Sequence, residues 1–149
     1  MLMAFTLICQ PGEANYEVLG WASEAGRTTG GSGGVEVTAS TGQEILDFIK
    51  DKKDGLISQP LTIYVNGVIT PDNTSSDSKI AIKDVDDVTL IGVEDRGVFD
   101  GIGIKIWRAS NIIVRNVMVF KVLVGDKDAI SIEGPADHIW IDHCENNAR

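Results

Sequence analysis

The chain has 149 residues, which suffices for one domain with a buried core. Hydrophobic residues make up 43% of it and charged residues 23%, a balance typical of a soluble globular protein and not of a disordered one. The formal net charge of −9 argues against nucleic acid as a partner, because binding to phosphates requires a basic surface.

The N-terminal segment MLMAFTLICQP is apolar but short. It has no Lys or Arg before the apolar run and no small-residue cleavage pattern, so it makes a poor signal peptide. It is also too short to span a membrane, and no other segment is long and apolar enough, so we expect no membrane partner. The segment is compatible with a degenerate remnant of a signal peptide and with a terminal strand.

The two cysteines, Cys9 and Cys144, lie far apart and form no Cys-x-x-Cys pair. They therefore indicate neither a zinc site nor a disulfide framework. We predict free thiols, with a single bridge between them as the alternative.

Residues 1–40 are predicted to hold an N-terminal strand and a glycine-rich loop. The loop reads GWASEAGRTTGGSGG from Gly20 to Gly34, and so many glycines and small polar residues favour irregular structure over a helix or a strand.

A helix is predicted over residues 41–55, where the sequence reads TGQEILDFIKDKKDG. Thr41 and Glu44 have the spacing of a capping box, and Gly55 is placed to end the helix. Its apolar residues recur at helical spacing, so that one face can be buried. They are Ile45, Leu46 and Ile49.

From residue 60 to residue 145 short strands rich in Val and Ile recur with a period near 25 residues. One family of strands begins at Leu61, Val88, Ile112 and Ile139. A second family keeps the same rhythm and begins at Ile80, Ile104 and Ile130. Two strand families in phase are typical of stacked coils.

These repeats predict an all-β fold, a parallel β-solenoid that forms a single domain over residues 1–149. Alternation places Ile112 and Val114 inward and sends Ile113 and Arg115 to the other face. The predicted helix can cap the first coil, whereas only NNAR follows Glu145. An immunoglobulin-like sandwich is the alternative, but its hairpins would not produce two in-phase repeats.

Asp126 and Asp128 are candidate metal ligands. In an extended segment residues two apart share a face, so their carboxylates would converge, and like charges that close favour a hard cation between them. Calcium takes six to eight oxygen ligands, so two carboxylates form only part of a site. The alternative is an acidic turn in water, with Lys127 softening the repulsion.

Other polar residues suggest weaker hypotheses. His138 and His143 lie five residues apart on a predicted strand, so a joint metal site is not expected. Cys144 beside His143 is predicted to be a buried thiol and not part of a catalytic dyad. Four basic residues on successive coils are candidates for a strip that binds a polyanion: Lys105, Arg108, Arg115 and Lys121.

The stretch GDKDAISIEGPADHIWIDHCE resembles the central motif of the pectate lyase family, which includes pectin lyases and plant pollen allergens. GWASEAGRTTGG is similar to the N-terminal segment of that family, and SNIIVRNVMVFKV resembles its strand before the metal site. The resemblance implies a right-handed parallel β-helix with an N-terminal capping α-helix. It also implies secretion, although this chain shows no clear signal peptide.

The resemblance further implies calcium-dependent β-elimination of polygalacturonate, with Ca2+ as the cofactor and pectin or polygalacturonate as the partner. Asp126 and Asp128 match calcium-binding aspartates of the family, and Asp142 matches a structural position. The remaining calcium ligands and the arginine base lie on later coils in the family, and Arg149 is no substitute. We therefore expect a chain truncated at its C-terminal end, with an incomplete site and weak or no catalysis as a monomer.

Two further alternatives remain open. One is a module that binds calcium or an acidic polysaccharide without cleaving it. The other is a structural solenoid whose open C-terminal coil stacks on a second copy, so that the chain forms a homo-oligomer.

Overall fold

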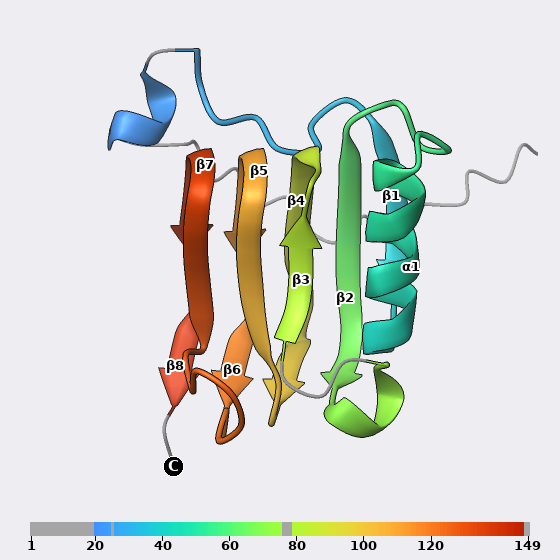
Figure 1. The fold of residues 1–149 in the computed structure, drawn as a ribbon, viewed down its shortest axis with the longest axis vertical. Helices are drawn as coiled ribbons and strands as arrows, with labels where there is room; N and C mark the ends of the chain where they lie inside the picture. The colour runs from blue at the N-terminus through green and yellow to red at the C-terminus, as the bar shows by residue number, and fades with distance from the viewer. Residues whose placement is uncertain (1–19, 25, 76–78, 148–149) are drawn as a thin grey trace, which may run out of the picture.

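A computed structural model describes residues 20–24, 26–75 and 79–147 (Figure 1). Cys9, Arg149 and the apolar N-terminal segment lie outside these residues. The helical elements are the 3-10 turns η1 (Gly20–Ser23) and η2 (Pro71–Asn73) and the helix α1 (Gly42–Lys53). The strands are β1 (Val35–Ala39), β2 (Leu61–Ile69), β3 (Lys79–Lys83), β4 (Asp86–Asp100), β5 (Gly103–Arg115), β6 (Met118–Phe120), β7 (Ile130–Asp142) and β8 (Glu145–Asn147).

Every strand pairing is parallel, and the pairings form three ladders along the stack. Ladder one places Val35, Leu61, Val88, Ile112 and Ile139 at one register position. Ladder two joins the ends of β2 and β4 to β6 and β8. Ladder three places Ile80, Ile104 and Ile130 at one register position. Both predicted strand families are thus confirmed residue for residue, and parallel pairing excludes the sandwich.

The long strands β4, β5 and β7 each bend and contribute to more than one ladder. The turns between ladders repeat from coil to coil as well as the strands do. Asp87, Asn111 and His138 immediately precede the ladder-one strands of successive coils, with φ of 59°, 57° and 51°. Asn116 and His143 follow those strands, with φ of 51° and 49°. Asn tolerates this left-handed backbone better than most residues, which suits these positions.

The core is the space that the three ladders enclose. Isoleucine, leucine and valine side chains point inward from successive coils, and many of them are fully buried. In ladder three, Ile82 and Ile106 are 0% exposed, whereas Ile132 at the same position of the last coil is 52% exposed. Stacking therefore buries the interior coil by coil and leaves the last described coil open on one side.

The helix α1 covers the opposite end of the stack, beside β1 and β2 (Figure 1). Its N-cap is Thr41, whose side chain accepts a hydrogen bond from the Glu44 amide, while the Glu44 carboxylate accepts from the Thr41 amide at 3.0 Å. Ile45 and Ile49 are buried, and Gly55 follows the helix with a φ of 79°. The predicted capping helix is confirmed.

Two details differ from the sequence expectations. The glycine-rich loop begins with the 3-10 turn η1, where irregular structure alone was predicted. Ile113, on the outer face of ladder one, is buried, because Gly30 of this loop approaches it so closely that a Cβ atom there would lie 3.0 Å from Ile113. In the described part of the chain, no helix is long and apolar enough to cross a membrane.

The observed architecture is the predicted parallel β-helix with an N-terminal capping helix. The stacking of a second copy on the open coil remains a prediction.

Candidate functional site

The segment that carries Asp126 and Asp128 links β6 to β7 and is a turn. Gly125 and Lys127 have φ of 69° and 61°, so the backbone is left-handed there. The expectation of an extended segment is wrong, because a left-handed residue between the two aspartates breaks the strand alternation. The backbone geometry therefore no longer predicts that the two carboxylates converge. Their assignment as calcium ligands rests on the family resemblance.

Lys79, on β3, holds this segment in place by hydrogen bonds. Its side chain is 7% exposed, and its Nζ donates to the Asp128 carbonyl oxygen at 2.8 Å and to Ser131 Oγ at 3.5 Å. Gly103 lies between Lys79 and the segment in ladder three, and a Cβ atom on it would lie 2.6 Å from the Asp128 carbonyl oxygen. Only glycine leaves room for the segment and the lysine to meet.

Further along ladder three, on its outer face, three basic side chains surround Trp107. Their charged groups lie 4.2 Å (Lys83), 5.3 Å (Lys105) and 4.1 Å (Arg108) from the ring centroid. We call these four residues the cation cluster. Lys83 pairs with Trp107 and Lys105 with Ser131 in the ladder register. The aromatic ring attracts the cations and so offsets part of their mutual repulsion.

Two carboxylates accompany the cation cluster. Lys105 Nζ lies 2.8 Å from Glu133. Asp84 accepts from Arg108 and from Lys53 Nζ, the latter at 3.1 Å. Cations outnumber acids here, so this face is locally basic on a chain of net charge −9. Among the described residues no carboxylate lies within ion-pair distance of Lys83.

The prediction of a basic strip therefore holds for two of its four residues. Lys105 and Arg108 belong to the cation cluster, but Arg115 and Lys121 lie elsewhere. Arg115 extends from ladder one, 3.1 Å from Asp142 and 4.3 Å from the Trp140 ring. Lys121 follows β6 and pairs with Asp100 at 3.5 Å. Sequence spacing missed Lys83, whose place beside Trp107 follows from the ladder-three register.

Asp142 and its neighbours form a polar cluster on ladder one. Besides Arg115, the Asp142 carboxylate contacts His143 Nδ1 at 2.7 Å. Cys144 has a free thiol that donates to the Asp142 carbonyl oxygen at 3.3 Å. Burial raises the pKa of this thiol, which keeps it protonated and poorly nucleophilic. These contacts agree with a structural role for Asp142, and Cys144 is partly buried where a buried thiol was predicted.

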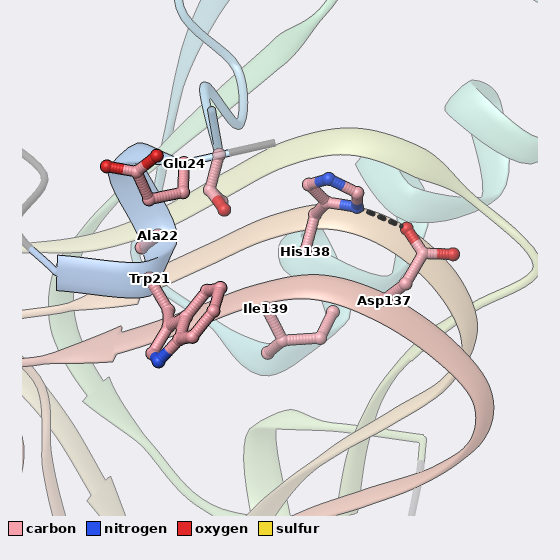
Figure 2. A pocket seen from close by; sticks show the side chains of 7 residues that line it. Trp21, Ala22, Glu24, Asp137, His138 and Ile139 are labelled. Atoms are coloured by element: carbon pink, nitrogen blue, oxygen red, sulfur yellow. Dashed lines mark hydrogen bonds and ion pairs between the residues drawn. The ribbon is translucent and has the colours of Figure 1, made fainter. Parts of the chain in front are cut away.

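A shallow pocket of about 300 Å³ lies between η1 and β7 (Figure 2). Trp21 at its edge is 91% exposed, and a carboxylate, Glu24, stands nearby. Its lining comprises Trp21, Ala22, Glu24, Thr28, Asp137, His138 and Ile139. Among the described residues, this lining holds the carboxylates of Glu24 and Asp137 and no Lys or Arg, so it does not suit an acidic polymer.

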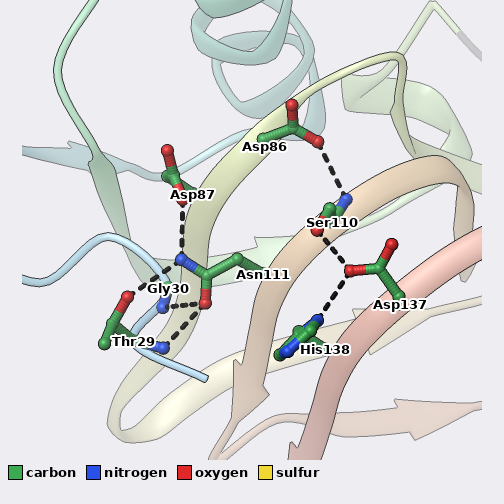
Figure 3. A network of polar contacts seen from close by, with 8 residues as sticks. All are labelled: Thr29, Gly30, Asp86, Asp87, Ser110, Asn111, Asp137 and His138. Atoms are coloured by element: carbon green, nitrogen blue, oxygen red, sulfur yellow. Dashed lines mark hydrogen bonds and ion pairs between the residues drawn. The ribbon is translucent and has the colours of Figure 1, made fainter. Parts of the chain in front are cut away.

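One side of this pocket belongs to a polar network (Figure 3). Asp137 Oδ1 accepts from Ser110 Oγ at 2.5 Å and lies 2.7 Å from His138 Nδ1. Both bonds lower the pKa of Asp137, the one from Ser110 more strongly. This is not a nucleophile triad, because the serine hydroxyl donates to the carboxylate and not to the imidazole.

The rest of the network anchors the glycine-rich loop on ladder one. Asn111 Oδ1 accepts from the backbone amides of Thr29 and Gly30 at 2.7 and 2.9 Å. Asn111 Nδ2 donates to Asp87 Oδ1 at 2.7 Å (Figure 3). These bonds satisfy loop amides that no strand pairs, so the network holds the loop in place.

Comparison with known proteins agrees with this architecture. A family model described as pectate lyase matches residues 1–149. A pectate trisaccharide-lyase of Bacillus licheniformis is 51% identical over 132 residues, covering 89% of this chain and 38% of that protein. The chain belongs to the pectate lyase family. A pectate lyase of Emericella nidulans is 35% identical over 127 residues, covering 85% of this chain and 34% of that protein.

Solved structures of pectate lyases share the fold. The crystal structure of a pectate lyase from a Bacillus species in complex with trigalacturonate superposes with a TM-score of 0.83 at 39% identity, over 87% of this chain and 42% of that chain. Pectate lyase C from Erwinia chrysanthemi, determined with Ca2+, has a TM-score of 0.62 at 22% identity, over 81% and 41% of the two chains. This chain thus spans about two fifths of its pectate lyase relatives.

The pectate lyase family implies a calcium ion, and two aspartates of this chain are candidates to hold it. Asp126 and Asp128 supply hard oxygen donors of the kind that calcium prefers. Within the described residues, however, no group of three or more His, Cys, Asp or Glu side chains could hold a metal ion. The carboxylate oxygens of Asp126 and Asp128 are suitable calcium ligands. They supply only part of the six to eight oxygen ligands that calcium takes.

Proposed function

We propose that this chain carries polygalacturonate-binding residues and the first calcium ligands of a pectate lyase. The observation that supports this proposal is the cation cluster on the outer face of ladder three, because the Asp126–Asp128 segment leads directly into the last described strand of that ladder, β7. Lys79 and Ser131 join the two, since Lys79 contacts both Asp128 and Ser131, and Ser131 is the register partner of Lys105.

The chemistry of the polymer suits this face. Each galacturonate unit carries one carboxylate, so a run of units requires several cations along a line. Lys83, Lys105 and Arg108 supply fixed positive charge, and Arg108 adds the planar fork that binds carboxylates well. Asp126 and Asp128 would hold calcium against the carboxylate of a neighbouring unit.

The reaction proposed for the whole protein is β-elimination. The C5 proton of a galacturonate unit lies α to its carboxylate; once it is removed, the C4–O bond breaks and leaves an unsaturated sugar. Calcium, when bound, would withdraw charge from the carboxylate and so acidify that proton. The residues described here bind and orient the polymer, and we assign the base to none of them. Secretion of the protein, which the family implies, also stays a prediction.

The test is calorimetric titration of trigalacturonate into the chain, with and without calcium. We expect binding that calcium strengthens and that weakens in Lys83→Met, because one cation of the cluster is lost. Asp126→Ala/Asp128→Ala should abolish the calcium effect and keep calcium-independent binding. Asp47→Ala/Asp51→Ala on α1 is the matched control and should bind as the unmodified chain does.

A lyase assay on polygalacturonate, followed by ultraviolet absorbance of the unsaturated product, tests catalysis separately. Activity lost on chelation and in Asp126→Ala/Asp128→Ala would extend the proposal to catalysis by this chain. Binding without activity would favour the binding-module alternative. Failure to bind trigalacturonate with or without calcium, in a folded chain, would refute the proposal.

A further inference from the structure

Asp84 and Arg108 occupy the same turn position of successive coils. Asp84 follows Lys83, Arg108 follows Trp107, and Lys83 and Trp107 are register partners in ladder three. Both turn residues are left-handed, with φ of 57° and 48°. Non-glycine residues rarely adopt this backbone, and here it brings the two side chains together one above the other.

The contact between them is a two-point ion pair. Arg108 Nε donates to Asp84 Oδ1 at 2.5 Å, and Arg108 Nη2 donates to Asp84 Oδ2 at 3.0 Å. The guanidinium carbon also lies 4.1 Å from the Trp107 centroid. One edge of the guanidinium is thus held by Asp84 while the ring of Trp107 constrains its position. Three of its five N–H donors bond no other acceptor among the described residues.

Asp84 is itself held from two further directions. Its backbone amide donates to the Trp107 carbonyl oxygen at 3.2 Å. Lys53, in the last turn of α1, lies 3.1 Å from Asp84 Oδ2. The carboxylate therefore connects the capping helix to the cation cluster through one charged group.

We propose that Asp84 is a positioning residue, which holds the Arg108 guanidinium with its free N–H donors available to a uronate carboxylate. This inference rests on the proposed function. It assigns Asp84 a role in polymer binding that acts through Arg108 and requires no contact between Asp84 and the polymer. Trp107 restricts where the guanidinium lies, and Asp84 restricts how it is turned. A flexible arginine would lose side-chain entropy on binding, whereas this one has lost it already.

The sign of the effect separates this role from simple electrostatics. Asp84 is an anion within a polyanion-binding face, so its charge alone opposes binding. If charge alone mattered, removing it would tighten binding of trigalacturonate. If Asp84 positions Arg108, removing it weakens binding in spite of the more favourable charge.

The experiment measures the Kd of trigalacturonate at fixed calcium for the unmodified chain and for Asp84→Asn. Asn keeps the shape but cannot accept both charge-assisted bonds, so we expect Kd to rise about tenfold. Asp100→Asn is the matched control, because it removes an exposed carboxylate that pairs with Lys121 on ladder two. Its Kd should stay the same or fall slightly.

Two further variants test the positioning itself. Arg108→Lys keeps the charge but lacks the fork, so it should weaken binding as Asp84→Asn does. The double variant Asp84→Asn/Arg108→Lys should have a Kd close to that of either single variant. Such non-additivity is expected of two residues that act as a unit. Lys53→Gln leaves the Asp84–Arg108 pair in place and should change Kd less than Asp84→Asn.

The outcomes are distinct. Unchanged or tighter binding by Asp84→Asn, with normal binding by the unmodified chain, would overturn the positioning role alone. Additive effects of Asp84→Asn and Arg108→Lys would overturn it too. A folded unmodified chain that binds no trigalacturonate would overturn the proposed function and this inference with it.

Discussion

Lys79 donates from its Nζ to the carbonyl oxygen of Asp128 at 2.8 Å, although 49 residues of chain separate them. The bond reaches across the coil that contains Gly103, whose missing side chain leaves the space. A buried ammonium group thus supports the turn that carries both candidate calcium ligands.

We expect Lys79→Met to weaken this support, since methionine fills the space but donates no hydrogen bond. Stability should fall by about 1–3 kcal/mol, the range for loss of a hydrogen bond from a charged donor, here the largely buried Lys79, and calcium affinity should fall with it. Urea unfolding and calcium titration measure the two effects. Lys121→Met, at an exposed lysine, serves as the control. A variant as stable as the unmodified chain would contradict the supporting role of Lys79.

Burial in the stack should decide the cost of core substitutions. Ile106→Ala is expected to cost about 2–5 kcal/mol, because it opens a cavity at a fully buried position. Ile132→Ala, at the same register position one coil later, should cost about 1 kcal/mol or less, since that side chain is 52% exposed. Equal losses in urea unfolding would mean that the last coil is covered in solution, as stacking with a second copy would require.

Acid should destabilise the fold through carboxylates whose pKa is lowered. Backbone amides of Ser40 and Thr41 lower the pKa of Glu44, and hydrogen bonds from Arg108 and Lys53 lower that of Asp84. Such groups stabilise the folded state above their unfolded pKa, about 4, and this contribution is lost as pH falls through the lower folded pKa. We expect Tm to be steady from pH 7 to 5 and to fall below about pH 4.

The capping box provides a variant for this measurement. Glu44→Gln removes one of the titrating groups and should show a shallower decline of Tm between about pH 5 and pH 2. A Tm that stays constant or rises over this range in the unmodified chain would be inconsistent with the lowered pKa values.

Cys144 should react slowly with iodoacetamide at pH 8. Burial raises the pKa of its thiol, so little thiolate is present. The measurement uses a Cys9→Ser variant, so that only Cys144 is alkylated, and compares its rate with the rate in urea. Equal rates in the two conditions would show that the thiol is accessible and ionises normally.

The sequence alone determined the architecture. Its strand starts recur in two in-phase families, and the structure pairs those residues in register, from Leu61 through Val88 and Ile112 to Ile139. The capping helix was equally predictable, because Thr41, Glu44 and Gly55 are local signals that act within a few residues. Periodicity is a property of the chain itself, and parallel stacking converts it directly into register.

The tertiary structure decided which residues share a face. The cation cluster combines side chains from two coils, and its members meet through ladder register and not through sequence spacing. Arg115 and Lys121 had the same sequence signal as Lys105 and Arg108, yet the bends between ladders send them to other faces. Asp126 and Asp128 were chosen on an alternation that Lys127 breaks, because a single left-handed residue redirects the side chains on either side of it.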